Sequence, residues 1–591
     1  MKYLGNINPD KYMLLNILYN KKMKDDTNDY LYVVYKDRET GEKHLKTIKD
    51  PELDYYVVKE EYRDFDYHKD FMPLEKVEKR TCKARNVIYD VANVAGGQYK
   101  SYLDHCNSTG QWKEKNKLHG MYPYVFGSDI PIETWYKIQY QLEYGSENIL
   151  YPLTKQFLDI EVDGIGVEGF PTPDVCPINA VTIIDAESST SYTFLLRNNK
   201  NPLIQEFEDT IEEFKQDLHE SFDESYGVFD YKFLMYDKEI DLIIDMFKLI
   251  NTLKRDFLMI WNMSFDIPYI IDRIHALGYD HEPIMCHKDF ATQSAYYVQS
   301  RTKIVEQRTD RFACNSYTTY LDQMVMYAGL RKGGGVLRSV KLNDVGRKEL
   351  KDEKLDYSDD ANIKTLPYVD YRKFVKYNIK DVLLQFGIDR KTSDLENLYL
   401  RTLFNATPYE RAFKQTTFLK NCAYVSFFQQ GYIICNNKPL DGDIDENANI
   451  IKTIFDDVDS EEEKEEEKEE QFAGALVADP MLNSPNGIEI FGQNSAFVYD
   501  YVTDEDFTAM YPSVIISFNV TASTLIGKLV LDIPVEKVKQ FYEMSDKDVR
   551  RFDAGREFVE NYISQNPGLV GNVWFDLPTA EELLEEFGGI N

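Results

Sequence analysis

The sequence has few cysteines and no long apolar run. Its seven cysteines lie far apart without a C-x-x-C pair, and its eight histidines form no group with the spacing of metal ligands. These patterns argue against a disulfide scaffold or a zinc site and fit a reducing cytoplasm. No segment approaches the ~18–20 consecutive apolar residues that span a bilayer, and residues 1–10 lack the apolar stretch of a signal peptide. We expect a cytoplasmic protein with no membrane partner.

Positive charge is also scarce. The chain has 68 Lys and Arg residues against 101 Asp and Glu, a net charge of −33. Nucleic-acid-binding proteins usually present a basic face, because Lys and Arg side chains replace the counterions of the phosphates. Part of the acidic excess is local: Asp456 to Glu470 holds eleven acidic residues and two lysines, which is typical of a solvated tract. Composition alone therefore favours a function that does not involve DNA.

The 591 residues, 43% of them hydrophobic, predict several domains. Residues 1–147 contain short β-rich runs between polar connections and predict an α+β domain. Residues 148–395 alternate apolar strands with helical spacing, which predicts a mixed sheet with helices packed on it. A helix over 408–430 precedes the acidic tract. The strands expected are Leu31–Tyr35, Tyr55–Val58, Gln156–Val162, Ala180–Ile184, Tyr192–Leu196, Phe257–Trp261 and Phe497–Val502.

Asp159 and Glu161 are two residues apart on the predicted strand 156–162. Side chains at i and i+2 point to the same face of a strand, so both carboxylates project together. Adjacent carboxylates repel each other unless a cation lies between them, and Mg²⁺ prefers such oxygen ligands. The alternative is an exposed strand face without a ligand, which an isolated D-x-E pair favours.

Two later segments add acidic side chains. Asp266 follows the apolar strand 257–261, where catalytic side chains of open sheets often lie, although an Asp before Ile-Pro also makes an ordinary helix N-cap. Tyr377 and Asp381 are four residues apart on a predicted helix and share one face. That face could present a metal ligand and a phenol, or it could be a solvated helix surface.

Taken together, D-I-E at 159–161, N-x-x-F-D at 262–266 and Y-x-x-x-D at 377–381 resemble the exonuclease motifs of the family B DNA polymerases, most closely those of the T-even bacteriophage type. The order and the gaps both match. One departure is that Asn262 and Phe265 have two residues between them, where T-even relatives have three.

The resemblance implies an RNase H-like 3′–5′ exonuclease domain over 148–395. In it, two Mg²⁺ or Mn²⁺ ions would be held by Asp159, Glu161, Asp266 and Asp381. Tyr377 would orient the attacking water. Asn262 and Phe265 would position the single-stranded 3′ end of the DNA.

A second match lies at Asp506-Phe507-Thr508-Ala509-Met510-Tyr511-Pro512-Ser513, which resembles the first palm motif of the same family, with Ala509 and Met510 in place of the usual Ser and Leu. The resemblance implies that Asp506 binds catalytic Mg²⁺ and that Ala509 and Met510 meet the incoming triphosphate through backbone N–H groups. The ring of Tyr511 would exclude a ribose 2′-hydroxyl. The alternative is a strand–turn–helix junction capped by Asp506.

Two further segments concern DNA contact. Gly474-Ala475 resembles the family's Y-x-G-G/A element, where small residues allow close approach of a template strand. The stretch 331–348 carries six basic residues against one acid and could line a strand path to the exonuclease site, or could be a solvated loop.

The later K-x-x-x-N-S-x-Y-G and D-T-D-S motifs of the family do not occur after Asp506. The resemblance therefore implies an N-terminal domain (1–147), an exonuclease domain (148–395), a helical return and acidic linker (396–470), and a partial palm (471–591) truncated near the fingers. We expect no DNA synthesis by this chain alone. A truncated or interrupted gene and a naturally split polymerase, whose second chain supplies fingers, remaining palm and thumb, both stay open.

The expected partners are a primer-template and the second chain, with a sliding clamp as a further family expectation. The expected location is the cytoplasm of an infected bacterial host. Two other functions remain open: a free-standing 3′–5′ exonuclease with a vestigial palm, and a non-catalytic replication scaffold.

Overall fold

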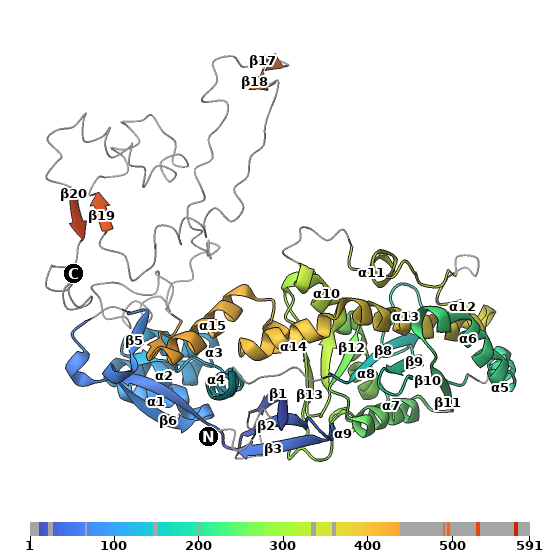
Figure 1. Cartoon of the computed structure of the whole chain (residues 1–591), viewed down its shortest axis with the longest axis horizontal. Coiled ribbons are helices and arrows are strands. Elements are labelled where there is room, and N and C mark those ends of the chain that lie inside the picture. Colours follow the sequence, from blue (N-terminus) through green and yellow to red (C-terminus); the bar gives the residue numbers. More distant parts are fainter. Residues whose placement is uncertain are drawn as a thin grey trace. The chain divides into compact units, whose positions relative to one another are not determined.

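The computed structural model describes residues 7, 11–21, 28–65, 68–145, 152–198, 200–331, 339–356 and 362–437, together with four short strands beyond them. The chain divides into two units, Met1–Val458 and Asp459–Asn591. Figure 1 colours the chain along its sequence, and the helices and sheets of the first unit are those from blue to orange. None of the helices in these described segments has the length and apolarity needed to cross a membrane.

The first part of the chain forms two antiparallel three-stranded sheets, with strand orders β1-β2-β3 and β6-β4-β7. Helices pack on both sheets, and the sheets and helices share one core that includes Tyr55 and Trp135. Tyr424, on a helix near the end of the unit, belongs to the same core. The elements are β1 (Tyr12–Asn20), β2 (Tyr30–Asp37), β3 (Lys43–Lys49), β4 (Glu52–Val58), β6 (Val77–Lys83), β7 (Val125–Phe126), α1 (Val87–Ala95), α2 (Gly97–Thr109), α3 (Trp112–Met121) and α4 (Ile132–Tyr144). The strands predicted at 31–35 and 55–58 are confirmed.

A six-stranded mixed sheet follows, in the order β11-β10-β9-β8-β12-β15. Neighbours β8, β9 and β10 are antiparallel, whereas β11, β12 and β15 run parallel to their neighbours. The strands are β8 (Lys155–Val162), β9 (Ile178–Asp185), β10 (Thr190–Leu196), β11 (Asp230–Tyr236), β12 (Phe257–Ile260) and β15 (Thr319–Asp322). The four strands predicted in this region, including the β9–β10 hairpin, are confirmed.

Helices cover both faces of this sheet (Figure 1). Phe157 of β8 belongs to the core that α6 and α13 form on one face, and Leu158 belongs to the core of α7 and α8 on the other. Burying each such apolar side chain contributes about 1.5–3 kcal/mol. The helices are α5 (Pro202–Asp209), α6 (Ile211–Tyr226), α7 (Glu239–Leu253), α8 (Met263–Ala276), α9 (Glu282–Met285), α10 (Gln323–Arg331), α11 (Leu342–Glu349), α12 (Leu366–Val369), α13 (Tyr371–Thr392) and α14 (Asp394–Phe404).

Strand alternation decides which face the two acidic residues of β8 occupy. Since side chains alternate along a strand, Asp159 and Glu161 share the face of Phe157, toward α13. Helix α13 begins where the Asp370 carboxylate accepts a hydrogen bond from the backbone N–H of Lys373 at 2.8 Å. Such an N-cap stabilises a helix by about 1 kcal/mol. The position at which α13 begins therefore decides which of its side chains lie opposite Asp159 and Glu161.

A buried charge cluster joins the N-terminal sheet to the six-stranded sheet. The ammonium groups of Lys36 on β2 and Lys43 on β3 lie 2.6 and 2.7 Å from the Asp256 carboxylate, which precedes β12, and all three side chains are buried. Burial lowers the pKa of Lys43 to about 8, although Asp256 opposes this shift. Removing one partner of a buried pair typically costs about 3–5 kcal/mol, so this cluster ties the two sheets together.

The helix predicted over 408–430 is only partly correct. The structure has a single 3₁₀ turn, Tyr409–Arg411, and α15 begins at Gln415 and ends at Gln429. The side chain of Tyr409 is buried and its hydroxyl donates to the backbone carbonyl of Leu15 at 2.6 Å. Because this contact fixes Tyr409 against β1, the 3₁₀ turn at 409–411 does not continue into α15. Strand β16 (Tyr432–Ile434) then pairs with β5 (Phe71–Pro73), and α15 packs on α4.

In the second unit the described elements are two antiparallel strand pairs. Strand β17 (Ile488–Ile490) pairs with β18 (Gln493–Ala496), and β19 (Lys528–Leu531) pairs with β20 (Val573–Asp576). The strand predicted at 497–502 lies outside the described residues. The remaining short sheet, in the first unit, is a hairpin of β13 (Ala295–Val298) and β14 (Arg311–Cys314).

Candidate functional site

Three of the four acidic residues singled out in the sequence meet in one group. Asp159 and Glu161 on β8 and Asp381 on α13 each offer a carboxylate oxygen, and these oxygens lie within 4.8 Å of one another. The i, i+2 spacing on β8 and the packing of α13 on that face of the sheet bring them together. An all-oxygen donor set of this kind suits a hard divalent cation such as Mg²⁺.

The fourth acidic residue, Asp266, lies beside this group but outside it. It sits in the first turn of α8, which follows β12, and β12 pairs in parallel with β8. Its side chain is only 3% exposed. Burial and, next, the charge of Asp159 raise the pKa of Asp266 well above its usual range. The structure therefore brings together side chains from β8, α8 and α13 whose positions span more than 200 residues of the sequence, from Asp159 to Asp381.

The carboxyl groups of the site are difficult to ionise together. Burial, followed by the nearby charge of Asp381, raises the pKa of Asp159 to about 7. The pKa of Glu161 is raised well above its usual range by burial and then by the charges of Asp159 and Asp381. Desolvation and like charges both disfavour the charged form. A divalent cation among these groups would relieve both effects, so the site has the electrostatics of a cation site.

A lysine that sequence reasoning missed completes the group. The ammonium of Lys354 donates to Asp381 Oδ2 at 2.5 Å and to the hydroxyl of Tyr377 at 3.2 Å. Burial opposes its charge, but Asp381, Tyr377 and Asp159 together raise the pKa of Lys354 above its usual range. Asn378, also on α13, donates to Asp159 Oδ2 at 3.2 Å. Lys354 lies in a short segment of mixed charges without helical or strand periodicity, so no pattern singled it out.

Tyr377 lies one turn before Asp381 on α13, and both contact Lys354, as the four-residue spacing predicts. Its ring is 6% exposed, and burial followed by the charge of Asp381 raises the pKa of its hydroxyl far above the usual value. The phenol therefore stays protonated at neutral pH. It can donate a hydrogen bond next to the carboxylates.

The comparisons with known proteins show what part of the chain is similar to. Residues 125–311 match the family described as DNA polymerase family B, exonuclease domain. This part of the chain is therefore similar to an exonuclease domain of that family. The chain is also 23% identical over 410 residues to the DNA-directed DNA polymerase of Escherichia phage RB69. That match covers 68% of this chain and 39% of the phage protein, so the chain spans well under half of this relative. Exonuclease domains of this kind use divalent metal ions.

The N-cap and the first turn of α8 carry the other two residues expected to act in the exonuclease domain. Asn262 adopts a left-handed conformation, with φ of 69°, and its side-chain oxygen accepts a hydrogen bond from the Ser264 hydroxyl at 2.9 Å. Phe265 is half-buried. Asp266 is therefore the fourth residue of α8 and not its N-cap, which is the position that Asn262 occupies.

A second aromatic ring that sequence reasoning missed faces Phe265. Phe170, in the loop 163–177 after β8, is 72% exposed, and its ring centre lies 5.4 Å from that of Phe265 in an edge-to-face arrangement. Lys364 holds this loop by donating to the carbonyls of Val167 and Gly169 at 2.8 and 2.6 Å. Phe170 and Phe265 thus place two aromatic rings side by side at this loop. The sequence does not reveal this contact, because it depends on how the loop packs against α8.

The basic stretch 331–348 gives little support to a strand path. Residues 332–338 lie outside the described residues. Of the others, Arg331 pairs with Asp394 at 2.8 Å, and Arg347 and Lys348 pair with neighbouring glutamates. These three cations have acidic partners in the chain itself, whereas Lys341 has no ion pair in the described part of the chain. The predicted palm and template residues, Gly474, Ala475, Asp506, Ala509, Met510 and Tyr511, also lie outside the described residues.

Proposed function

We propose that this chain removes nucleotides from the 3′ end of single-stranded DNA, as the proofreading exonuclease of a replicative family B DNA polymerase. The observation that carries the proposal is the group of Asp159, Glu161 and Asp381, with oxygens within 4.8 Å of one another and Asp266 beside them. The mixed six-stranded sheet with helices on both faces is consistent with an RNase H-like domain. The domain bounds predicted from the sequence stay predictions.

We infer that Asp159, Glu161, Asp266 and Asp381 hold two divalent cations, Mg²⁺ or Mn²⁺. The donor set fits, because it consists of carboxylate oxygens whose pKa values are raised by burial and then by the charges of neighbouring carboxylates, and a divalent cation would offset both effects. When bound, such a pair of ions activates a water molecule and stabilises the leaving 3′-oxygen. The amide of Asn378 holds the carboxylate of Asp159 in place for this role.

The other residues of the site would position the water and the DNA end. Lys354 holds the hydroxyl of Tyr377 beside Asp381, so that Tyr377 can orient a water molecule toward the phosphodiester. Phe265 and Phe170 offer two rings at right angles on which terminal bases could stack. Asn262 would contact the terminal nucleotide.

The polarity of digestion tests this function. A single-stranded oligonucleotide labelled at its 5′ end should give a ladder of progressively shorter labelled products in Mg²⁺ and none in EDTA. A phosphorothioate at the last 3′ linkage should slow the reaction, whereas the same group at the first 5′ linkage should not. Absence of digestion, or release of the 5′ label as a mononucleotide, would reject the proposal.

We further propose that Asp506 to Ser513 forms the start of a polymerase palm. The support is the match of D-F-T-A-M-Y-P-S to the family's first palm motif, together with the similarity to a protein named as a DNA polymerase. Asp506 would bind Mg²⁺ as one of the carboxylates that a two-metal nucleotidyl-transfer site needs. Asp506→Ala should leave digestion intact and eliminate synthesis, measured in the presence of a protein that carries the later motifs of the family; retained synthesis would remove Asp506 from the mechanism.

A further inference from the structure

A cavity of about 580 Å³ lies away from the carboxylates, where β1, α4, the β14–β15 region and the segment 408–420 meet. Its lining does not include Asp159, Glu161 or Asp381. One wall carries Arg308, whose guanidinium donates to the Ser264 hydroxyl at 2.9 Å, in the turn before Asp266. The cavity is therefore separate from the exonuclease site but shares an element with it. Its volume lies in the range of about 300–1,000 Å³ that is usual for small-molecule sites.

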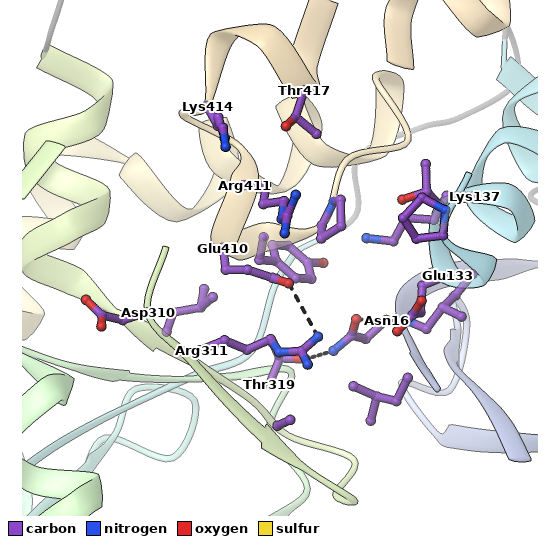
Figure 2. Close-up of a pocket in the computed structure, with 18 of the residues that line it drawn as sticks. Asn16, Glu133, Lys137, Asp310, Arg311, Thr319, Glu410, Arg411, Lys414 and Thr417 are labelled. Atoms are coloured by element: carbon purple, nitrogen blue, oxygen red, sulfur yellow. Dashed lines mark hydrogen bonds and ion pairs between the residues drawn. The ribbon is translucent and has the colours of Figure 1, made fainter. Parts of the chain in front are cut away.

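The cavity is lined by six cations and five carboxyl groups, and only some of the cations have an ion-pair partner in the described part of the chain. Arg308, Arg311 and Lys420 each pair with a carboxylate of the cavity wall. Three more cations line the cavity without an ion pair to any acid in the described part of the chain: Lys137, Arg411 and Lys414. In Figure 2 these three lie on the same side of the Arg311–Glu410 ion pair.

Lys137 is the most constrained of these cations. Its side chain is 7% exposed, and its ammonium contacts the carbonyl of Thr407 at 3.1 Å. Burial lowers its pKa to about 8, although the charges of Glu410 and Glu133 partly oppose this shift. A buried ammonium without an ion-pair partner is costly, and an anion in the cavity would stabilise it. The cations without ion-pair partners mark the part of this cavity that would accept a negatively charged ligand.

Aromatic and hydroxyl groups line the same cavity. The ring of Tyr296 lines the cavity and is 44% exposed, and the hydroxyls of Thr416 and Thr417 lie along the same lining. Stacking of a base on an exposed ring contributes about 1–3 kcal/mol. Cations for a phosphate next to a ring for a base are the combination that recognises a nucleotide.

We propose that this cavity binds one nucleotide, with its phosphate toward Arg411, Lys414 and Lys137 and its base against Tyr296. The nucleotide is either free or part of a single strand, because the same groups recognise both. This site does not depend on digestion at the carboxylates, and its test works without metal.

The test measures binding to the full chain in EDTA, with 2′-deoxyadenosine 5′-monophosphate, the oligonucleotide (dA)₄ and inorganic phosphate as separate ligands. The wild type should bind the mononucleotide saturably. Arg411→Gln with Lys414→Gln should weaken this binding at least tenfold. Lys232→Gln with Lys248→Gln, which removes the same charge from exposed positions outside the cavity, should leave it unchanged. Tyr296→Ala should weaken binding of the mononucleotide more than that of phosphate.

The two nucleotide ligands tell the sources apart. Binding of (dA)₄ at least tenfold tighter than the mononucleotide identifies a strand as the ligand, and similar affinities identify a free nucleotide. Three results would overturn the proposal: no saturable binding by the wild type, equal loss of affinity in the cavity and control variants, or inorganic phosphate that binds as tightly as the mononucleotide. Circular dichroism of each variant checks that the exposed substitutions leave the fold intact.

Discussion

At the residue scale, Lys354 connects the acidic group to the phenol of Tyr377. The ammonium of Lys354 contacts Asp381 Oδ2 at 2.5 Å and the Tyr377 hydroxyl at 3.2 Å. It therefore fixes the phenol relative to the carboxylates. Small displacements of groups that position a reactant lower the rate more than the affinity.

Replacing Lys354 should mainly affect the rate of digestion. We expect Lys354→Met to lower kcat for single-stranded DNA by about 10–100-fold, with little change in KM, because the phenol loses its fixed position. Steady-state digestion measures both constants. Lys248→Met, at an exposed site on α7, is the matched control. Equal kcat in the two variants would show that Lys354 has no positioning role.

At the element scale, the loop 163–177 presents Phe170 next to Phe265 of α8. We expect Phe170→Ala to raise KM for single-stranded DNA by about 5–100-fold, because a stacking contact of ~1–3 kcal/mol is lost. Val175→Ala shortens another exposed apolar side chain of the same loop, 65% exposed, and should change KM little. If the two variants have the same KM, Phe170 does not contact the DNA.

His119 on α3 contacts the loop between β7 and α4. Its ring hydrogen bonds to the hydroxyl of Ser128 in that loop at 2.9 Å. Burial lowers the pKa of His119 to about 4, although Asp129 opposes the shift. The unfolded chain, with a histidine pKa of about 6.5, therefore binds a proton that the folded chain excludes. The folded state therefore keeps the whole of this histidine's contribution to stability above pH 6.5, and the free energy of unfolding falls as the pH drops from 6.5 toward 4.

His119→Gln should make the N-terminal region less sensitive to acid. The free energy of unfolding of the wild type should fall more between pH 7 and 4.5 than that of the variant, because only the wild type has His119, which is protonated more easily in the unfolded state. The difference should be at most about 3 kcal/mol. Denaturant titrations at both pH values measure the difference. His219→Gln, on α6, provides the comparison, and a wild-type slope equal to that of His119→Gln would contradict the assignment.

Local periodicity explains which parts of the site were predictable. The pairs Asp159–Glu161 and Tyr377–Asp381 follow the strand and helix periods, so their shared faces could be read from the sequence. Lys354 and Phe170 lie in aperiodic segments, and their positions depend on how distant parts of the chain pack. The same limit explains the error at 408–430, where the long-range contact of Tyr409 with Leu15 interrupts an otherwise helical pattern.

At the scale of the whole molecule, the chain is acidic and yet contains a segment similar to the exonuclease domain of family B DNA polymerases. The negative charge of the site itself comes from groups that a divalent cation would neutralise. The mixed sheet brings β8, α8 and α13 to one place, and the Asp256 cluster fixes the N-terminal sheet against that sheet. Binding of an anionic substrate therefore depends on the local arrangement of cations and not on the net charge.

Digestion of single-stranded DNA by the Asp159→Ala, Glu161→Ala double variant tests the nuclease site most directly. The rate in Mg²⁺ should fall below about one-thousandth of the wild-type rate, with an unchanged circular dichroism spectrum, because the cations lose two of their carboxylates. Asp272→Ala with Glu224→Ala removes the same charges from exposed helix positions and should digest at the wild-type rate. Wild-type digestion by the double variant at Asp159 and Glu161 would contradict the assignment of the site.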